Sequence, residues 1–204
     1  MSKSAVIFCG GEYVDPKRID TDEKLFVVCA DSGYDNALKA GFSPDIVIGD
    51  FDSIQNEIKD AEIMRLPVHK DETDTQVCVD YLIKNGFEKV YMICALGGRI
   101  DHTMANTALL AYGALRGIEL TIVGENFYMF PIIGKKEIIG KPGEMFSVFP
   151  YGGNCTGVVE KGFEYELDGG TLFFDVPMGI SNVLTENTAN VEVENGILIA
   201  VHYR

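Results

Sequence analysis

The chain has few basic residues compared with acidic ones. It contains 17 lysines and arginines and 31 aspartates and glutamates, which gives a formal net charge of −14. A protein that binds nucleic acid needs basic patches to neutralise phosphates, so this composition argues against unassisted nucleic-acid binding. Tryptophan is absent, and no apolar run approaches the ~18 residues of a membrane-spanning helix. We therefore expect neither nucleic acid nor a membrane as a partner.

Cysteine pairing motifs are also missing. The five cysteines are an odd number, are scattered, and include no C-x-x-C pair. They are Cys9, Cys29, Cys78, Cys94 and Cys155. Most lie in apolar runs, which favours buried free thiols. The apolar stretch at residues 5–9 is too short for the core of a signal peptide. We expect a cytoplasmic protein.

Motifs for nucleophilic catalysis are absent as well. There is no G-x-S-x-G sequence, no Walker A loop and no cysteine with a nearby histidine. The three histidines, His69, His102 and His202, lack the spacing of a metal-binding pair. A covalent protein nucleophile therefore finds little support in the sequence.

The first part of the chain does contain a clear α/β pattern. Apolar runs at residues 5–9, 25–30, 46–48 and 90–96 each lead into glycine or aspartate, and helical patterns lie between several of them. Continuous apolar runs of this length are typical of buried parallel strands. We predict that residues 1–125 form an α/β domain with an open, mostly parallel sheet.

Beyond Asn126 the helical periodicity disappears, and turn signals arrive every 8 to 12 residues. We predict an all-β sandwich domain over residues 126–204. Turns are expected at residues 141–143, 152–154 and 168–170, and Asn195-Gly196 is a β-hairpin signal.

A carboxylate pair follows the strand predicted at residues 46–48, in the sequence Gly49-Asp50-Phe51-Asp52-Ser53. In open α/β sheets ligands bind beyond the carboxyl ends of the strands, where this pair would lie. Two carboxylates with one residue between them repel each other unless a cation lies between them, which points to a divalent metal. The structural alternative is that Asp52 or Ser53 caps a following helix.

Two other polar segments also follow predicted strands. Asp71 and Asp74 precede a predicted helix, where they can cap its exposed amides and still act as ligands. Gly97-Gly98-Arg99 precedes the next helix, an arrangement that suits a phosphate because the glycines free the backbone and arginine binds phosphate oxygens in pairs. Metal-binding carboxylates, glycine loops and one arginine are typical of sites for phosphoryl transfer, where positioning and charge neutralisation do most of the catalysis.

Four motifs together resemble the bacterial thiamine pyrophosphokinase family in order and approximate spacing. They are Ala30-Asp31-Ser32-Gly33, Gly49-Asp50-Phe51-Asp52-Ser53, Lys70-Asp71-Glu72-Thr73-Asp74 and Gly97-Gly98-Arg99-Ile100-Asp101-His102. The resemblance extends through residues 179–182 and 195–198, and so covers nearly the whole chain. It implies an enzyme that transfers diphosphate from ATP to the hydroxyethyl oxygen of thiamine and releases AMP. It also implies Mg²⁺, a catalytic domain at residues 1–125 and a thiamine-binding domain at residues 126–204.

The resemblance further implies roles for particular residues. Metal binding falls on Asp50, Asp52 and Asp74, and the catalytic set comprises Asp50, Asp52, Asp71, Asp74 and Arg99. The nucleotide and diphosphate pocket matches Asp31, Ser32, Gly33, Arg99, Asp101, His102 and Asn106. Ser181 and Asn182 match the part that meets thiamine. Two departures are Ser32, where many members have glycine, and the missing tryptophan on which some members stack thiamine.

Two alternative functions remain open from the residues. One is a diphosphokinase for another heterocyclic alcohol, such as a hydroxymethylpterin, and the other is a non-enzymatic sensor of metal-bound nucleotide. We also expect a homodimer in which each thiamine site joins the α/β domain of one chain to the β domain of the other. This follows partly from the resemblance and partly from the small β domain, because a domain of about 80 residues has a limited core.

Overall fold

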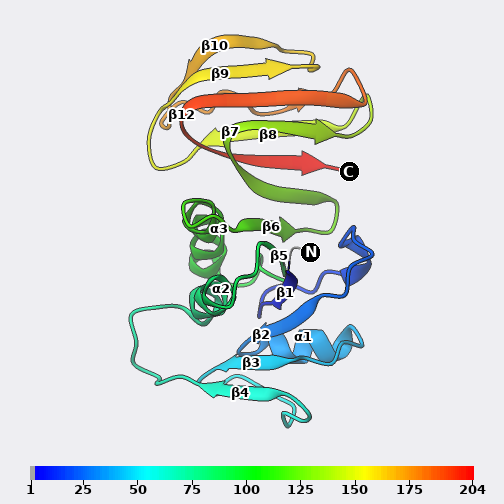
Figure 1. Cartoon of the computed structure of the whole chain (residues 1–204), viewed down its shortest axis with the longest axis vertical. Helices are drawn as coiled ribbons and strands as arrows, with labels where there is room; N and C mark the ends of the chain where they lie inside the picture. The colour runs from blue at the N-terminus through cyan, green and yellow to red at the C-terminus, as the bar shows by residue number, and fades with distance from the viewer. Residues whose placement is uncertain (1–2) are drawn as a thin grey trace. The chain divides into compact units, whose positions relative to one another are not determined.

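The computed structural model describes residues 3–204, and the chain divides into two compact units, Met1–Glu125 and Asn126–Arg204 (Figure 1). Unit 1 alternates strands and helices along the chain. Its elements are β1 (Ser4–Phe8), η1 (Pro16–Arg18), β2 (Phe26–Ala30), α1 (Gly33–Lys39), β3 (Ile46–Gly49), β4 (Glu62–Arg65), α2 (Asp74–Lys84), β5 (Lys89–Ile93), α3 (Ile100–Ala114) and β6 (Glu119–Val123).

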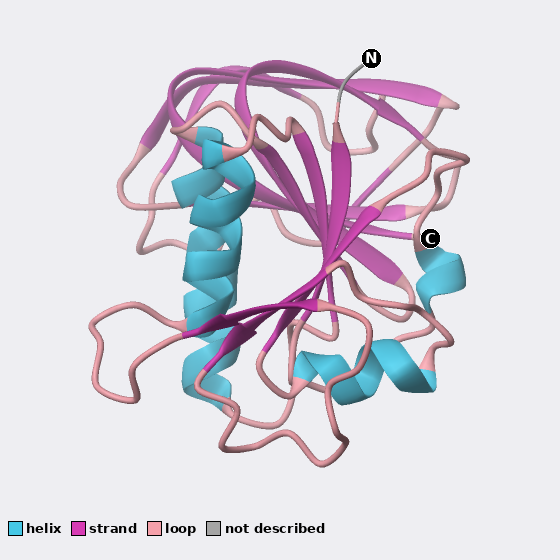
Figure 2. Ribbon diagram, turned by 60° about the horizontal axis from the view of Figure 1, so that its bottom comes forward, coloured by secondary structure: helices cyan, strands magenta, loops and turns pink. Residues whose placement is uncertain are grey.

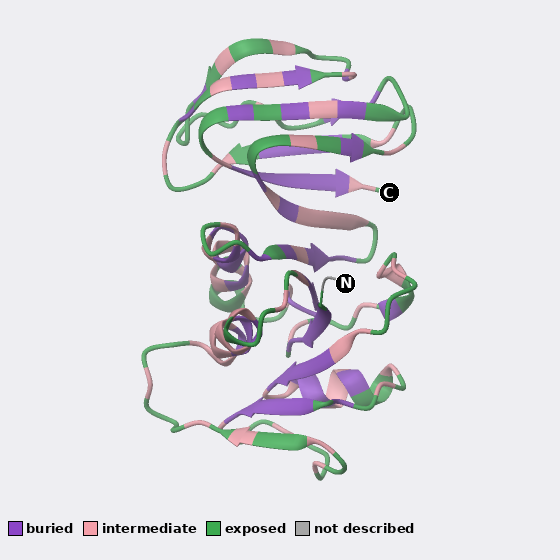
Figure 3. Ribbon diagram, in the orientation of Figure 1, coloured by how far each residue is buried: buried purple, intermediate pink, exposed green. Residues whose placement is uncertain are grey.

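The strands of unit 1 pair in parallel in the order β6-β5-β1-β2-β3-β4. Figure 2 shows α1 on one face of this sheet and α2 and α3 on the other. Covered faces explain why β1 and β3 are fully buried, whereas the edge strand β4 is largely exposed (Figure 3). The predicted α/β fold with a parallel sheet is confirmed.

The order of the strands fixes where a ligand can bind. After β1 the chain builds β2, β3 and β4 on one side, and then returns to build β5 and β6 on the other. The carboxyl ends of neighbouring parallel strands meet at one edge, and the change of direction between β1 and β5 opens a crevice there. The loops after β2, β3 and β5 all leave from this edge.

Unit 2 consists of β-strands over all its regular structure. They are β7 (Phe127–Ile139), β8 (Met145–Pro150), β9 (Cys155–Lys161), β10 (Leu167–Leu172), β11 (Asn182–Val183) and β12 (Thr188–Tyr203). The pairings are antiparallel. The first half of β12 pairs with β9 and the second half with β8, while β7 runs alongside both halves. The two long strands therefore contribute to two layers that enclose a core including Phe146, Val158 and Leu198.

Two turn predictions in unit 2 are wrong. Asn195-Gly196 lies inside β12, where the pairing with β7 shifts between Val193 and Leu198, and Gly196 has a φ of 111°. The glycine bends a continuous strand instead of reversing it, because both flanks of β12 remain paired. Residues 168–170 likewise lie inside β10, at register shifts against β9. Residues 141–143 and 152–154 connect strands as predicted.

No helix among the described residues is long and apolar enough to cross a membrane.

Candidate active site

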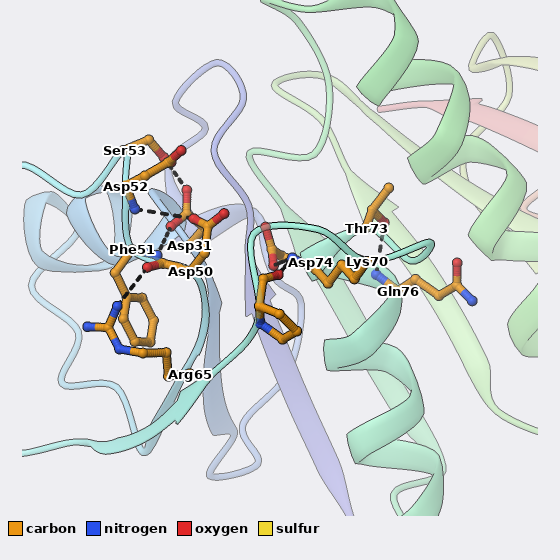
Figure 4. Close-up of polar contacts among 11 residues, drawn as sticks. Asp31, Asp50, Phe51, Asp52, Ser53, Arg65, Lys70, Thr73, Asp74 and Gln76 are labelled. Carbon is orange, nitrogen blue, oxygen red and sulfur yellow. Dashed lines mark hydrogen bonds and ion pairs between the residues drawn. The ribbon is translucent and has the colours of Figure 1, made fainter.

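Three carboxylates gather at the carboxyl edge of the sheet of unit 1. Asp31 directly follows β2 and Asp50 directly follows β3, and these two strands are neighbours. One carboxylate oxygen from each of Asp31, Asp50 and Asp52 lies within 4.8 Å of the others (Figure 4). The structure thus brings Asp31, which the resemblance assigns to the nucleotide, into contact range of the predicted metal pair. We call these three residues the acidic cluster.

The chain reaches this arrangement through glycine and a strained turn. A Cβ at Gly49 would lie 2.9 Å from the Asp31 Cβ, so only glycine lets β3 end this close to Asp31. Asp31 and Phe51 have φ values of 46° and 69°, a left-handed conformation that costs about 1–3 kcal/mol at a residue other than glycine. The Phe51 N–H donates to Asp31 Oδ1 at 3.1 Å, and the Ser53 hydroxyl donates to Asp31 Oδ2. Asp31 therefore organises the turn as well as the cluster.

Arg65 supports the same turn from the edge strand β4. Its Nη1 donates to the Asp50 carbonyl at 3.0 Å, and its guanidinium lies 4.7 Å from the centroid of the Phe51 ring (Figure 4). These contacts engage the backbone and the ring of the turn, and none of the three carboxylates forms an ion pair with a described residue. Within the part of the chain that the structure describes, the charge of the acidic cluster therefore has no ion-pair partner.

The electrostatics of the cluster suit a divalent cation. The pKa of Asp52 is raised, chiefly by the charge of Asp50, then by desolvation and by the charge of Asp31. Such repulsion is relieved when a cation binds between the carboxylates. Three hard oxygen donors are the ligands that Mg²⁺ prefers, so the residues present fit that ion.

The capping alternative for Asp52 and Ser53 is wrong, because the chain forms no helix between β3 and β4. This loop is held by Asp35 of α1, whose carboxylate accepts from the backbone N–H groups of Gln55 at 2.9 Å and Asn56 at 3.2 Å. The pair after β3 is therefore presented by a loop fixed from a neighbouring helix.

Asp74 and Asp71 lie at the start of α2. Thr73 is the N-cap, since its side chain accepts from the Gln76 N–H at 3.2 Å. Asp74 forms an ion pair with Lys70 at 2.9 Å, drawn to one side of the acidic cluster in Figure 4. Asp74 is near enough to contribute to the raised pKa of Asp52, and Asp71 is exposed. Unlike the cluster, Asp74 has an ion-pair partner, although its buried Oδ1 accepts no hydrogen bond from the described residues.

The loop after β5 presents Arg99 just before α3. Gly97 and Gly98 have φ values of 83° and 64°, and a Cβ at Gly97 would lie 2.4 Å from the Glu12 side chain. Arg99 binds Asp101 through Nε at 3.1 Å and Nη2 at 2.5 Å. This pairing lowers the pKa of Asp101 to about 2. A phosphate that binds Arg99 must compete with Asp101.

The remaining predicted nucleotide residues have mixed environments. His102 is exposed, and its backbone N–H donates to Asp101 Oδ1. Asn106 is buried and donates to the Ala95 carbonyl at 2.7 Å, so it supports the loop after β5. Ser32 is the residue before α1, without a capping hydrogen bond from its side chain, and Gly33 begins that helix.

Sequence reasoning missed Asn36, Arg65 and the partner role of Lys70. Asn36 donates from Nδ2 to the carbonyls of Cys9 at 2.9 Å and Gly11 at 3.3 Å, which ties α1 to the loop after β1. No local pattern marks such residues, because their partners come from other strands. The spacing of Lys70 and Asp74, four residues apart, is the one signal that was available.

The two predicted thiamine residues lie in unit 2. Ser181 is exposed, has a φ of 58°, and donates from its backbone N–H to the Ser147 hydroxyl at 3.0 Å. Asn182 is buried, and its amide both accepts from Tyr165 N–H at 3.0 Å and donates to Tyr165 O at 2.8 Å. The structure therefore leaves Ser181 accessible, whereas the amide of Asn182 is engaged within unit 2.

Comparisons with known proteins give a consistent result. Residues 21–122 match the family profile "Thiamin pyrophosphokinase, catalytic domain", and residues 135–198 match "Thiamin pyrophosphokinase, vitamin B1 binding domain". The chain is 27% identical over 190 residues to thiamine pyrophosphokinase from Bacillus subtilis, covering 89% of this chain and 88% of the relative. It is 24% identical over 215 residues to thiamine pyrophosphokinase 1 from Oryza sativa, covering 90% of this chain and 81% of the relative.

Solved structures share the fold. The crystal structure of the Bacillus subtilis thiamine pyrophosphokinase aligns with a TM-score of 0.89 at 23% identity, covering 98% of this chain and 99% of that one. The structure of thiamin pyrophosphokinase from Candida albicans aligns with a TM-score of 0.82 at 16% identity, covering 100% and 90%. Since the two profiles together match most of the sequence and agree with the four ordered motifs, the chain belongs to the thiamin pyrophosphokinase family.

Proposed function

We propose that the carboxyl edge of unit 1 carries out the reaction of this family, transfer of diphosphate from ATP to the hydroxyethyl oxygen of thiamine. The chain is accordingly an ATP-dependent diphosphotransferase. The observation that carries the assignment of the site is the grouping of one carboxylate oxygen from each of Asp31, Asp50 and Asp52 within 4.8 Å, without an ion pair to any described lysine or arginine.

Asp31, Asp50 and Asp52 would hold Mg²⁺, with Asp74 beside them. When bound, the ion neutralises charge on the phosphates and supplies the positive field that an acidic chain lacks. The inclusion of Asp31 rests on its distance to the other two carboxylates. Asp74 forms an ion pair with Lys70, but its buried Oδ1 has no hydrogen-bond partner among the described residues, so it remains a candidate ligand.

The protein's own groups then have separable tasks. Arg99 exchanges Asp101 for an oxygen of the diphosphate, because a phosphate offers the same paired acceptors as a carboxylate. An aspartate of the acidic cluster can accept the hydroxyl proton of thiamine, because a loose transition state makes little demand on a tuned base. The hydroxyl oxygen bonds to the β-phosphorus of ATP, the bond from that phosphorus to the α–β bridging oxygen breaks, and AMP leaves. No protein nucleophile is required.

We further propose that unit 2 binds thiamine and that the working unit is a homodimer with shared sites. The segment between β10 and β11 supports this, because its apolar side chains lie on the surface. They are Phe173, Phe174, Val176, Met178 and Ile180, with exposed fractions of 42–67%. A run of this kind is typical of an interaction surface, and a second copy of the chain is the commonest partner for a homo-oligomer. A cytoplasmic location is supported by the five free cysteines.

Product analysis tests the reaction. Purified protein with ATP, Mg²⁺ and thiamine should give AMP and thiamine diphosphate in ³¹P nuclear magnetic resonance spectra, with no ADP. ADP together with thiamine monophosphate would contradict diphosphate transfer. AMP formed with a hydroxymethylpterin but not with thiamine would favour the alternative diphosphokinase, and ATP binding without any AMP would favour the sensor.

Subunit mixing tests the shared site. Asp52→Asn and Ser181→Trp should each be inactive alone, and should recover toward a quarter of wild-type activity after subunit exchange. Half of the dimers in a statistical mixture are hybrids, and each hybrid has one intact site out of two. No recovery despite demonstrated exchange, or full activity in a monomer, would overturn the shared site.

A further inference from the structure

Unit 1 contains a cavity of about 870 Å³ at the amino-terminal edge of its parallel sheet. Its lining includes Ser4 and Phe26, the first residues of β1 and β2, and Asp45, which immediately precedes β3. Asp31 and Asp50 of the acidic cluster follow the opposite, carboxyl ends of β2 and β3. Five residues of β2, at about 3.3 Å each, place the two edges roughly 15 Å apart. The cavity is therefore separate from the site proposed for diphosphate transfer.

Three partly exposed aromatic rings form the apolar part of this cavity. The rings of Phe26 and Tyr81 are nearly parallel, with centroids 6.5 Å apart and an interplanar angle of 17°. The Phe87 ring lies 5.2 Å from that of Phe26. Flat faces of this kind favour a planar aromatic ligand through stacking. A volume of this size lies in the range of roughly 300–1,000 Å³ that is typical of small-molecule sites.

The carboxylates at the cavity already have structural partners. Asp45 Oδ2 accepts from the Val27 N–H at 2.7 Å and so fixes the start of β2. Glu23 accepts from the Ser4 hydroxyl. These hydrogen bonds from neutral donors occupy one oxygen of each carboxylate and fix its position, and both groups keep their charge.

The donors of the cavity are less fully engaged. Lys24 is exposed, and no described residue forms an ion pair or hydrogen bond with its ammonium group. Lys3 donates to the Asn85 carbonyl at 3.2 Å and lies 5.6 Å from the centroid of Phe87, which leaves further donor hydrogens. The pKa of Tyr81 is raised, first by desolvation and then by the charges of Glu62 and Asp45, so its hydroxyl keeps its proton.

We propose that this cavity is a second ligand site that takes a small planar aromatic anion, with its ring system on Phe26, Tyr81 and Phe87 and its carboxylate or phosphate at Lys24 and Lys3. Rings and cations then act on different parts of one molecule. This site does not depend on the proposed diphosphate transfer, because it uses no residue of the acidic cluster.

Titration with 2-naphthoate, followed by ¹⁵N-resolved amide shifts of the full chain without ATP, tests the proposal. Saturable shifts are expected for amides at residues 3–4, 23–27 and 81–87, and not at residues 31 and 50–52. The neutral 2-naphthylmethanol should bind more weakly. Lys24→Met should weaken naphthoate binding about tenfold, because it removes a charge-assisted contact and keeps the aliphatic stem. Lys84→Met is the matched control, since Lys84 is an exposed lysine of α2 outside the lining.

Tyr81→Phe is a second, conservative variant. It keeps the ring on which the ligand stacks and removes only the hydroxyl, so naphthoate should bind it about as well as the wild type. Thermal melting of each variant checks that it is folded. The proposal is overturned if shifts do not saturate, if Lys24→Met and Lys84→Met behave alike, or if 2-naphthylmethylammonium binds better than naphthoate. Shifts confined to residues 31 and 50–52 would also overturn it. Since the readout is binding, failure here leaves the diphosphate-transfer assay unaffected, and the reverse holds as well.

Discussion

The carboxylates of the acidic cluster in unit 1 and the carboxylate of Glu160 in unit 2 form no ion pair with a described residue, yet their surroundings differ. The cluster lies in loops at strand ends, and Asp52 is exposed. Glu160 lies within β9, opposite Val191 and Leu167, with 1% of its surface exposed and no hydrogen-bond partner for Oε1 among the described residues. Burial raises the pKa of Glu160 to about 7.

This difference in surroundings decides which carboxylates are available to bind a ligand. At the sheet edge, repulsion among charged neighbours is the main cause of the raised pKa of Asp52, and water or a metal ion can relieve it. Inside unit 2, desolvation acts on a single group, and taking up a proton is the only relief. An acidic group is therefore available as a ligand at the edge and neutralised in the core.

The largest expected effect is on turnover. Asp50→Asn should lower kcat by about a thousandfold, because loss of a ligand forfeits several kcal/mol of charge stabilisation. Glu160→Gln should retain wild-type kcat, and Asp20→Asn, at an exposed aspartate outside the site, is the matched control. Steady-state assays at ordinary Mg²⁺ concentrations measure all three. Full activity of Asp50→Asn would remove the acidic cluster from the mechanism.

The next effect concerns the stability of Glu160→Gln at different pH values. Burial raises the pKa of Glu160 from 4.5 to about 7 in the folded state. The contribution of protonated Glu160 to the free energy of unfolding is therefore fully present below pH 4.5 and is lost as pH rises through 7. The loss amounts to about 3 kcal/mol at most. Urea unfolding at pH 5 and pH 8 should show this fall in the wild type and not in Glu160→Gln. Glu192→Gln, at an exposed position of β12, should behave like the wild type.

A smaller change is expected where a carboxylate at the edge already has a partner. Lys70→Met should lower stability by about 1–2 kcal/mol, since it leaves the mostly buried Asp74 charge unpaired. Adding Asp74→Asn to that variant should restore most of the loss. Denaturant unfolding of the single and double variants measures the coupling, and equal stability of Lys70→Met and wild type would mean that the pair contributes nothing.

The smallest expected effect is a rise in melting temperature for Asp52→Asn at pH 7 without Mg²⁺. A raised carboxyl pKa means that repulsion penalises folding once the group ionises, so the gain should appear above its ordinary titration range and vanish in acid. Mg²⁺ should then stabilise the wild type more than the variant. Scanning calorimetry with and without the ion checks both signs.

The sequence predicts the strands and helices of unit 1 well, because buried parallel strands are continuous apolar runs that end at glycine or aspartate. It does not give strand order, and so it cannot show that Asp31 and Asp50 leave neighbouring strands. Contacts such as Arg65 with the Asp50 carbonyl depend on that order as well. In unit 2 the local signal at Asn195-Gly196 is overridden, because β12 is held by partners on both sides.

The β2–α1–β3 segment has a consequence for how the molecule reaches its native state. Asp31 and Asp50 are brought together by one short crossover, so closing that loop costs little chain entropy and should be fast. Unit 2 instead requires Phe127 to pair with Tyr203, at opposite ends of its sequence. We expect the acidic cluster to assemble early in refolding, so that Mg²⁺ can bind to unit 1 before β12 has paired with its neighbouring strands.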